Sequence, residues 1–112
     1  MVGGHKKMIG EVIVLGELKL RDGANLDEYK GLGERMYGIV SRLPGFLSVK
    51  SFKAEDGDEI TLFRFASEEA LEAWRTHPDH VETIRRGHAE FYASVFMQIC
   101  KVIREVGPVE HS

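Results

Sequence analysis

The segment 11–20 carries apolar residues on both of its faces, and this pattern limits the folds that the chain can adopt. Because side chains alternate along a strand, Val12 and Val14 point to one side, whereas Ile13 points to the other. The segment 94–104 shows the same two-sided pattern. A sheet built from such strands needs apolar cover on both faces, so one face left in water is not expected.

The other patterns predict an order of elements around these strands. Leu26 begins an apolar stripe of helical period, which Asn25 can cap and Pro44-Gly45 ends. Asp56-Gly57 is a favourable hairpin turn between two strand-like segments. Pro78 separates two short helices, and Ser67 can cap the first of them. The predicted order is strand, helix, strand, strand, helix, helix and strand, over residues 11–20, 26–43, 46–54, 59–65, 67–77, 78–92 and 94–104.

This order is the ferredoxin-like split βαβ pattern, an α+β fold whose four-stranded antiparallel sheet carries its helices on one face. We expect one domain over residues 10–104, with short tails at 1–9 and 105–112. The chain has no further helix for the second face of the sheet. A second subunit packed sheet against sheet is the economical cover, so the sequence predicts a homodimer.

Composition excludes several classes of partner. The 112 residues carry a net charge of -3, so no basic surface for nucleic acid or an anionic membrane is expected. No apolar run is long enough to span a bilayer, and residues 1–9 lack the hydrophobic stretch of a secretion signal. The single cysteine, Cys100, excludes an intramolecular disulfide and is expected to pack as a small apolar residue. These features favour a cytoplasmic protein.

Residues that can carry chemistry gather between positions 74 and 92. This stretch holds the only Trp and three of the five His of the chain. The earlier helix contains Gly31, Gly33 and Gly38, whose thin surface would leave room for a ligand between helix and sheet. The chain has no GxGxxG fingerprint, no Walker loop and no cysteine cluster, so no cofactor or metal is expected.

One set of motifs spans most of the second half of the chain. It reads Phe65-x-Ser67-x-Glu69-Ala70-Leu71-x-x-Trp74-x-x-His77-Pro78-x-His80, then Gly87-x-x-x-Phe91-Tyr92 and Gln98-Ile99-Cys100-x-Val102. This pattern resembles the antibiotic biosynthesis monooxygenase (ABM) domain family, and the resemblance extends over about residues 10–104. It implies a dimeric α+β barrel of ferredoxin-like subunits.

The resemblance also implies a small cofactor-independent monooxygenase that oxidises an aromatic or quinol-type molecule with dioxygen. A deprotonated phenol or hydroquinone can give an electron to dioxygen itself, so the protein must supply a base, stabilise the anion and exclude water. One alternative is a non-catalytic dimer that binds a small apolar ligand. A second is a haem-binding or haem-degrading protein, although the haem branch has a ligating histidine where this chain has Ile84, and an asparagine on its first strand that this chain lacks.

Four residues are candidates for the centre of the site. Trp74 either belongs to the core or stacks on an aromatic ligand. His80 is the favoured base and His88 the second candidate, because an imidazole titrates near neutral pH. Each histidine also has a structural interpretation. His80 would bond to a local backbone group, and His88 would be a boundary residue of an apolar stripe that begins at Val81. His77 is expected at a helix end and near the substrate, and Pro78 argues against a helical metal pair with His80.

The remaining candidates are substrate contacts. Arg64 either pairs with a carboxylate such as Glu11 or holds an anionic substrate. Ile84 and Phe91 are expected to line the substrate site. Tyr92 either donates its hydroxyl to a ligand oxygen or covers the core.

Overall fold

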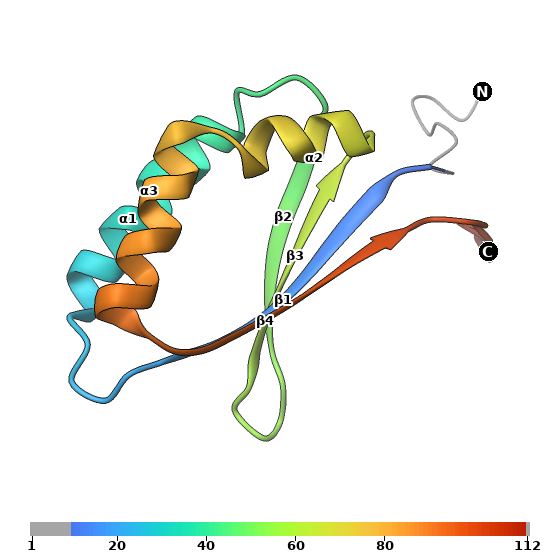
Figure 1. The fold of residues 1–112 in the computed structure, drawn as a ribbon. Helices are drawn as coiled ribbons and strands as arrows, with labels where there is room; N and C mark the ends of the chain where they lie inside the picture. The colour runs from blue at the N-terminus through green and yellow to red at the C-terminus, as the bar shows by residue number, and fades with distance from the viewer. Residues whose placement is uncertain (1–9, 112) are drawn as a thin grey trace.

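The computed structural model describes residues 10–111, so the predicted tail at 1–9 lies outside the described residues. Its elements are β1 (Val12–Leu20), α1 (Leu26–Val40), β2 (Phe46–Lys53), β3 (Glu59–Phe65), α2 (Glu68–Arg75), α3 (Pro78–Arg86), the π-helical turn η1 (Gly87–Phe91) and β4 (Tyr92–Lys101). All strand pairs are antiparallel, in the order β2-β3-β1-β4. The predicted ferredoxin-like α+β fold is confirmed (Figure 1).

The helices begin at the predicted caps. Asn25 Oδ1 accepts a hydrogen bond from the Glu28 N–H at 3.0 Å, and Ser67 Oγ accepts one from the Ala70 N–H at 3.1 Å. Both side chains supply acceptors to N–H groups that have no partner inside the helix. The last predicted helix is different, because α3 ends at Arg86 and passes through η1 into β4, which begins two residues earlier than expected.

The sheet separates two faces with different surroundings. The helices lie together over one face, called here the inner face (Figure 1). Val14 lies between Phe63 and Ile99 on this face, whereas Ile13 lies between Arg64 and Cys100 on the opposite, outer face. Cys100 lies on this uncovered outer face and is exposed in the single chain, so the packing expected for it from the sequence does not come from the chain's own helices.

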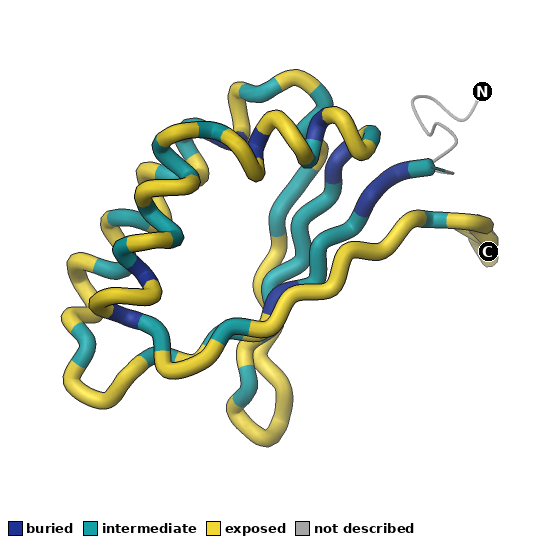
Figure 2. Tube along the Cα trace, viewed as in Figure 1, coloured by how far each residue is buried: buried dark blue, intermediate teal, exposed yellow. Residues whose placement is uncertain are grey.

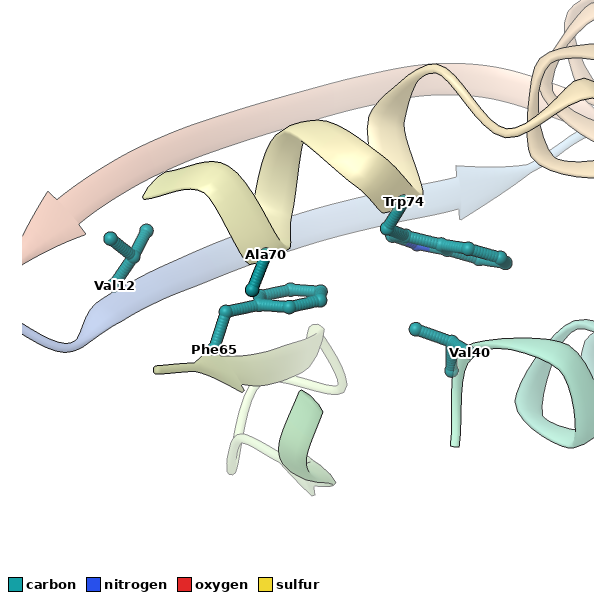
Figure 3. Packing of buried hydrophobic residues seen from close by; sticks show 5 residues of the cluster. All are labelled: Val12, Val40, Phe65, Ala70 and Trp74. Carbon is teal, nitrogen blue, oxygen red and sulfur yellow. The ribbon is translucent and has the colours of Figure 1, made fainter. Parts of the chain in front are cut away.

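The buried core is small and lies at one end of the molecule. Val12, Val40, Phe65, Ala70 and Trp74 form its buried cluster, where α2 meets β1 and β3 (Figure 3). Elsewhere the chain is mostly half-buried or exposed (Figure 2). The helices and the sheet therefore do not fill the space between them along their whole length.

Close packing at the core end requires a small residue in the turn before β2. Gly45 has a φ of 84°, a left-handed backbone conformation that favours glycine. A Cβ atom built on Gly45 would lie 2.6 Å from the Cβ of Ala70. Gly45 therefore lets α2 approach this turn closely.

One prediction about a helix face needs correction. Val81 was expected on the apolar stripe of the last helix, but its side chain is 53% exposed. The residues of α3 that line the space under the helices are His80, Thr83 and Ile84, so Ile84 lies on the inward face as predicted and His80 takes the place expected for Val81. Within residues 10–111, no helix is long and apolar enough to cross a membrane.

Candidate functional site

A cavity of about 630 Å³ lies between the helices and the inner face of the sheet. This volume is within the usual range of small-molecule sites. Its sheet wall is apolar and includes Val14, Val49 and Phe63. On α1, Gly33 lines the cavity, and a Cβ built there would meet no atom within 4 Å. This open space agrees with the expectation that the glycines of α1 leave room for a ligand between the helix and the sheet.

Trp74 and His80 form one end of the cavity. Their ring centroids lie 4.3 Å apart with the planes tilted by 32°, and both residues line the cavity wall. Trp74 is 6% exposed and also belongs to the buried cluster (Figure 3). Trp74 therefore belongs both to the core and to the cavity wall.

The electrostatic setting of His80 favours a neutral imidazole. Burial lowers its pKa, and the nearby His77 acts in the same direction, whereas backbone groups of Arg75 and Trp74 act in the opposite one. Its Nδ1 atom is buried and has no hydrogen-bond partner among residues 10–111. A half-buried neutral imidazole that lines the cavity is chemically suited to accept a proton from a ligand.

Tyr29, His88 and Tyr92 form a second polar group in the wall. The rings of Tyr29 and Tyr92 lie 6.3 Å apart, and those of His88 and Tyr92 5.4 Å apart, both edge to face. His88 comes eight residues after His80, so the two polar groups are separated by roughly 12 Å along the helix. A ligand that fills the cavity would therefore meet hydrogen-bonding groups at two places.

The phenols of this group remain protonated at neutral pH. Burial, with a smaller effect of Tyr29, raises the pKa of Tyr92 to about 12. Burial also raises the pKa of Tyr29, and the negative charge of Glu59 adds to the increase. Both hydroxyls can therefore donate hydrogen bonds to a ligand oxygen. Tyr29 was not among the predicted site residues, although it lies on the helical stripe that the sequence analysis used.

Five of the eight predicted site residues line the cavity, and they come from α2, α3, η1 and β4: Trp74, His80, Ile84, His88 and Tyr92. The other three lie elsewhere. His77 caps the N-terminus of α3, where its Nδ1 accepts the Asp79 N–H at 3.1 Å. Phe91 is 2% exposed and packs at 5.7 Å against the ring of Tyr29. Neither side chain forms part of the wall.

Arg64 lies on the outer face of the sheet, away from the cavity. Its Nη1 is 2.7 Å from Oε1 of Glu11, whose side chain is 2% exposed. This is the ion pair that the sequence analysis named as one of two alternatives. A nearly buried carboxylate needs a cation close by, so the contact explains why an arginine is present in the strand.

The donor groups of the wall do not form a metal site. Within residues 10–111, no group of three or more His, Cys, Asp or Glu residues is placed to hold a metal ion. Ile84 lines the cavity at the position where the haem-degrading branch has its ligating histidine, and its hydrocarbon side chain cannot ligate iron. His80 and His88 remain the imidazoles of the wall.

The fold and the cavity define a class of small α+β proteins in which helices cover an apolar ligand-sized space on one face of a ferredoxin-like sheet. The chain belongs to the antibiotic biosynthesis monooxygenase family, whose model matches residues 12–86. It is also 34% identical over 77 residues to the uncharacterized protein YqjZ of Bacillus subtilis (strain 168), a match that covers 69% of this chain and 68% of that protein. The family resemblance read from the sequence is confirmed.

Solved structures show the same fold at lower sequence identity. SnoaB, a cofactor-independent oxygenase from Streptomyces nogalater, aligns with a TM-score of 0.71 and 14% identity, over 89% of this chain and 99% of that one. Rv0793 from Mycobacterium tuberculosis aligns with a TM-score of 0.71 and 21% identity, over 87% and 99%. A ferredoxin-like dabb family protein from Mesorhizobium loti aligns with a TM-score of 0.66 and 17% identity, over 85% and 99%. These similarities concern the fold.

Proposed function

We propose that the protein is a cofactor-independent monooxygenase that oxidises a reduced aromatic or quinol-type molecule with dioxygen. The observation that carries the proposal is the shared wall of Trp74 and His80 in one apolar cavity. Family membership and the likeness to the cofactor-independent oxygenase SnoaB support this class of reaction. The cavity gives such a substrate an environment with little water, where an anion is reactive toward dioxygen.

In the proposed reaction, His80 takes a proton from the substrate. The indole of Trp74 stacks on the aromatic system of the substrate and limits its orientation. The substrate anion then gives one electron to dioxygen, and the two radicals combine into a peroxide. When a ring CH₂ becomes C=O, one oxygen atom enters the product and the other leaves as water, so the substrate supplies all the electrons.

The second polar group contributes hydrogen bonds to the bound molecule. The hydroxyls of Tyr29 and Tyr92 are protonated donors, and a donor directed at an oxygen that gains negative charge lowers the barrier of such a step. We assign this role to Tyr92 in particular, because it lines the cavity beside His88. His88 is the second candidate base.

We also propose that the working unit is a homodimer. The outer face of the sheet is covered by no helix among residues 10–111 (Figure 1). It displays Phe52 and Phe96, each 54% exposed, beside Ile13 and Leu15. Apolar surface of this kind is usually covered in a stable protein, and a second copy of the sheet is the simplest cover. A cytoplasmic location stays a prediction from the sequence.

The test is oxygen consumption with anthrone as the probe substrate. The wild-type protein should consume one dioxygen per anthrone, and His80→Ala should lower kcat by about a hundredfold or more, the usual contribution of a base. His77→Ala is the matched control, because that imidazole caps α3 outside the cavity wall. It should lose about 1 kcal/mol of stability and retain its rate.

Ligand binding without turnover would contradict the enzymatic proposal. If anthrone or anthraquinone raises the melting temperature of the wild-type protein while no oxygen is consumed, the protein is a small-molecule binder. The size and apolar wall of the cavity favour that function as the second candidate.

A further inference from the structure

Two backbone irregularities meet near His88 and Tyr92. α3 continues into the π-helical turn η1, where the Tyr92 N–H donates to the carbonyl of Gly87. The pairing of β1 with β4 changes register between Lys19 and Leu20. Helical π-turns and strand bulges are frequent at functional sites. The contacts that hold these irregularities together are therefore candidates for a functional role.

Arg21, which follows the register shift, makes these contacts. Its guanidinium donates to the carbonyls of His88, Ala89 and Tyr92 at 2.5, 2.8 and 2.9 Å. Its own backbone N–H donates to the carbonyl of Phe91 at 2.8 Å. Carbonyls in the last turn of a helix lack intrahelical partners, and a cation is favourable at this end of the helix. One residue thus supplies donors to four carbonyls.

The same turn determines where Tyr92 lies. A Cβ atom on Gly87 would be 2.3 Å from the ring of Tyr92, so the ring packs directly on the glycine backbone. Arg21 does not line the cavity, whereas His88 and Tyr92 do. Its planar group can serve several carbonyls at once, which the single ammonium of lysine does less well.

We propose that Arg21 is a positioning residue, which holds η1 in its π-helical form and so keeps Tyr92 packed on Gly87 and directs Tyr92 and His88 into the cavity. The proposal rests on the proposed function only in taking the cavity as the ligand site. Arg21 itself touches the backbone of the turn and no substrate.

Nuclear magnetic resonance provides a readout that does not depend on catalysis. The ring current of Tyr92 displaces the α-proton resonances of Gly87 in the wild-type protein. In Arg21→Ala this displacement should be lost, and in Arg21→Lys it should be reduced. Arg85→Ala is the matched control, because Arg85 is an exposed arginine that bonds to Glu82 of its own helix. It should leave the Gly87 resonances unchanged.

Binding of the neutral fluorescent probe N-phenyl-1-naphthylamine tests the effect on the cavity. Arg21→Ala should bind the probe about tenfold more weakly than the wild type, because the hydrogen bonds of the guanidinium no longer hold η1 in the form that shapes the cavity. If Arg21→Ala does not fold, Arg21→Lys decides the question. Unchanged Gly87 resonances in a folded Arg21 variant overturn the proposal. A wild-type protein that fails to oxidise anthrone contradicts the proposed function and leaves the resonance test valid.

Discussion

The imidazole of His80 lies 4.3 Å from the indole of Trp74, measured between ring centroids, with the planes tilted by 32°. The pair joins α3 to α2 at the only end of the molecule that has a buried hydrophobic cluster among the described residues. The His80 ring packs against the buried indole of Trp74 and also lines the cavity. The pair therefore combines a fixed position with access to a ligand.

The fluorescence of Trp74 should report the titration of His80. The chain has one Trp, and a protonated imidazole in ring contact quenches indole emission. Because burial lowers the pKa of His80 below its ordinary value of 6.5, emission should fall with a midpoint below pH 6.5. His80→Ala should abolish the transition, and His77→Ala should preserve it with a slightly higher midpoint, because the nearby His77 lowers the pKa of His80. A midpoint above 6.5 would contradict the described environment of His80.

The rate of anthrone oxidation should depend on pH in the same direction. The neutral form of His80 is the base, so kcat/KM should be constant near pH 7 and fall as the pH decreases through the lowered pKa of His80. The free energy of unfolding should also decrease toward acid, because His80 binds a proton more readily in the unfolded chain than in the folded one. This contribution is complete above pH 6.5, the ordinary value, and is lost as the pH falls through the lowered pKa. A rate that rises toward acid would rule out His80 as the base.

Gly33→Leu should block the cavity without destabilising the fold. A Cβ at Gly33 meets no atom within 4 Å, and the residue lines the cavity. Replacing a helical glycine gains up to about 1 kcal/mol of helix stability. We expect an equal or higher melting temperature and a loss of N-phenyl-1-naphthylamine binding in fluorescence titrations.

Gly31→Leu is the matched control for this substitution. Gly31 lies on the same helix with equally open space around it, but does not line the cavity. It should gain the same stability and bind the probe as the wild type does. Equal binding in both variants would place the ligand elsewhere.

Arg64→Ala should weaken the fold and leave substrate affinity unchanged. The substitution leaves the nearly buried carboxylate of Glu11 without its cation. Because the Arg64 side chain is 39% exposed, we expect a loss of only about 1–2 kcal/mol in urea unfolding. Adding Glu11→Gln to this variant should recover part of the lost stability, because it removes the unpaired charge. A KM for anthrone that rises in Arg64→Ala at constant kcat would instead indicate a substrate contact.

Phe96→Asp should separate the proposed homodimer. Phe96 is 54% exposed on the outer face, and a charge buried at an interface is costly. Sedimentation should give a mass of twice 12.6 kDa for the wild type and of one chain for the variant. Val81→Asp changes a residue of similar exposure, 53%, on α3 and should leave the mass unchanged. A wild-type mass of 12.6 kDa would refute the dimer.

Much of the candidate site followed from local patterns. Trp74 and His80 belong to the motif, Ile84 was expected as a substrate contact, and all three line one cavity. His77 belongs to the same motif, yet the turn at Pro78 makes it a cap instead of a wall residue. Tyr29 was missed as a site residue because a tyrosine on an apolar stripe looks like core. Its role depends on the empty space in front of it, which no local pattern reveals.

The sequence by itself determined the order of the elements, the caps at Asn25 and Ser67, and the family. These properties depend on residues close together in the chain, through periodicity, turn residues and side-chain acceptors. Only the tertiary structure decided which face each side chain meets. The exposure of Val81, the pairing of Ile13 with Arg64 and the π-helical turn with its contacts to Arg21 result from contacts between distant segments. The direction of a side chain depends on how its element packs, so the cavity wall is a property of the packed chain.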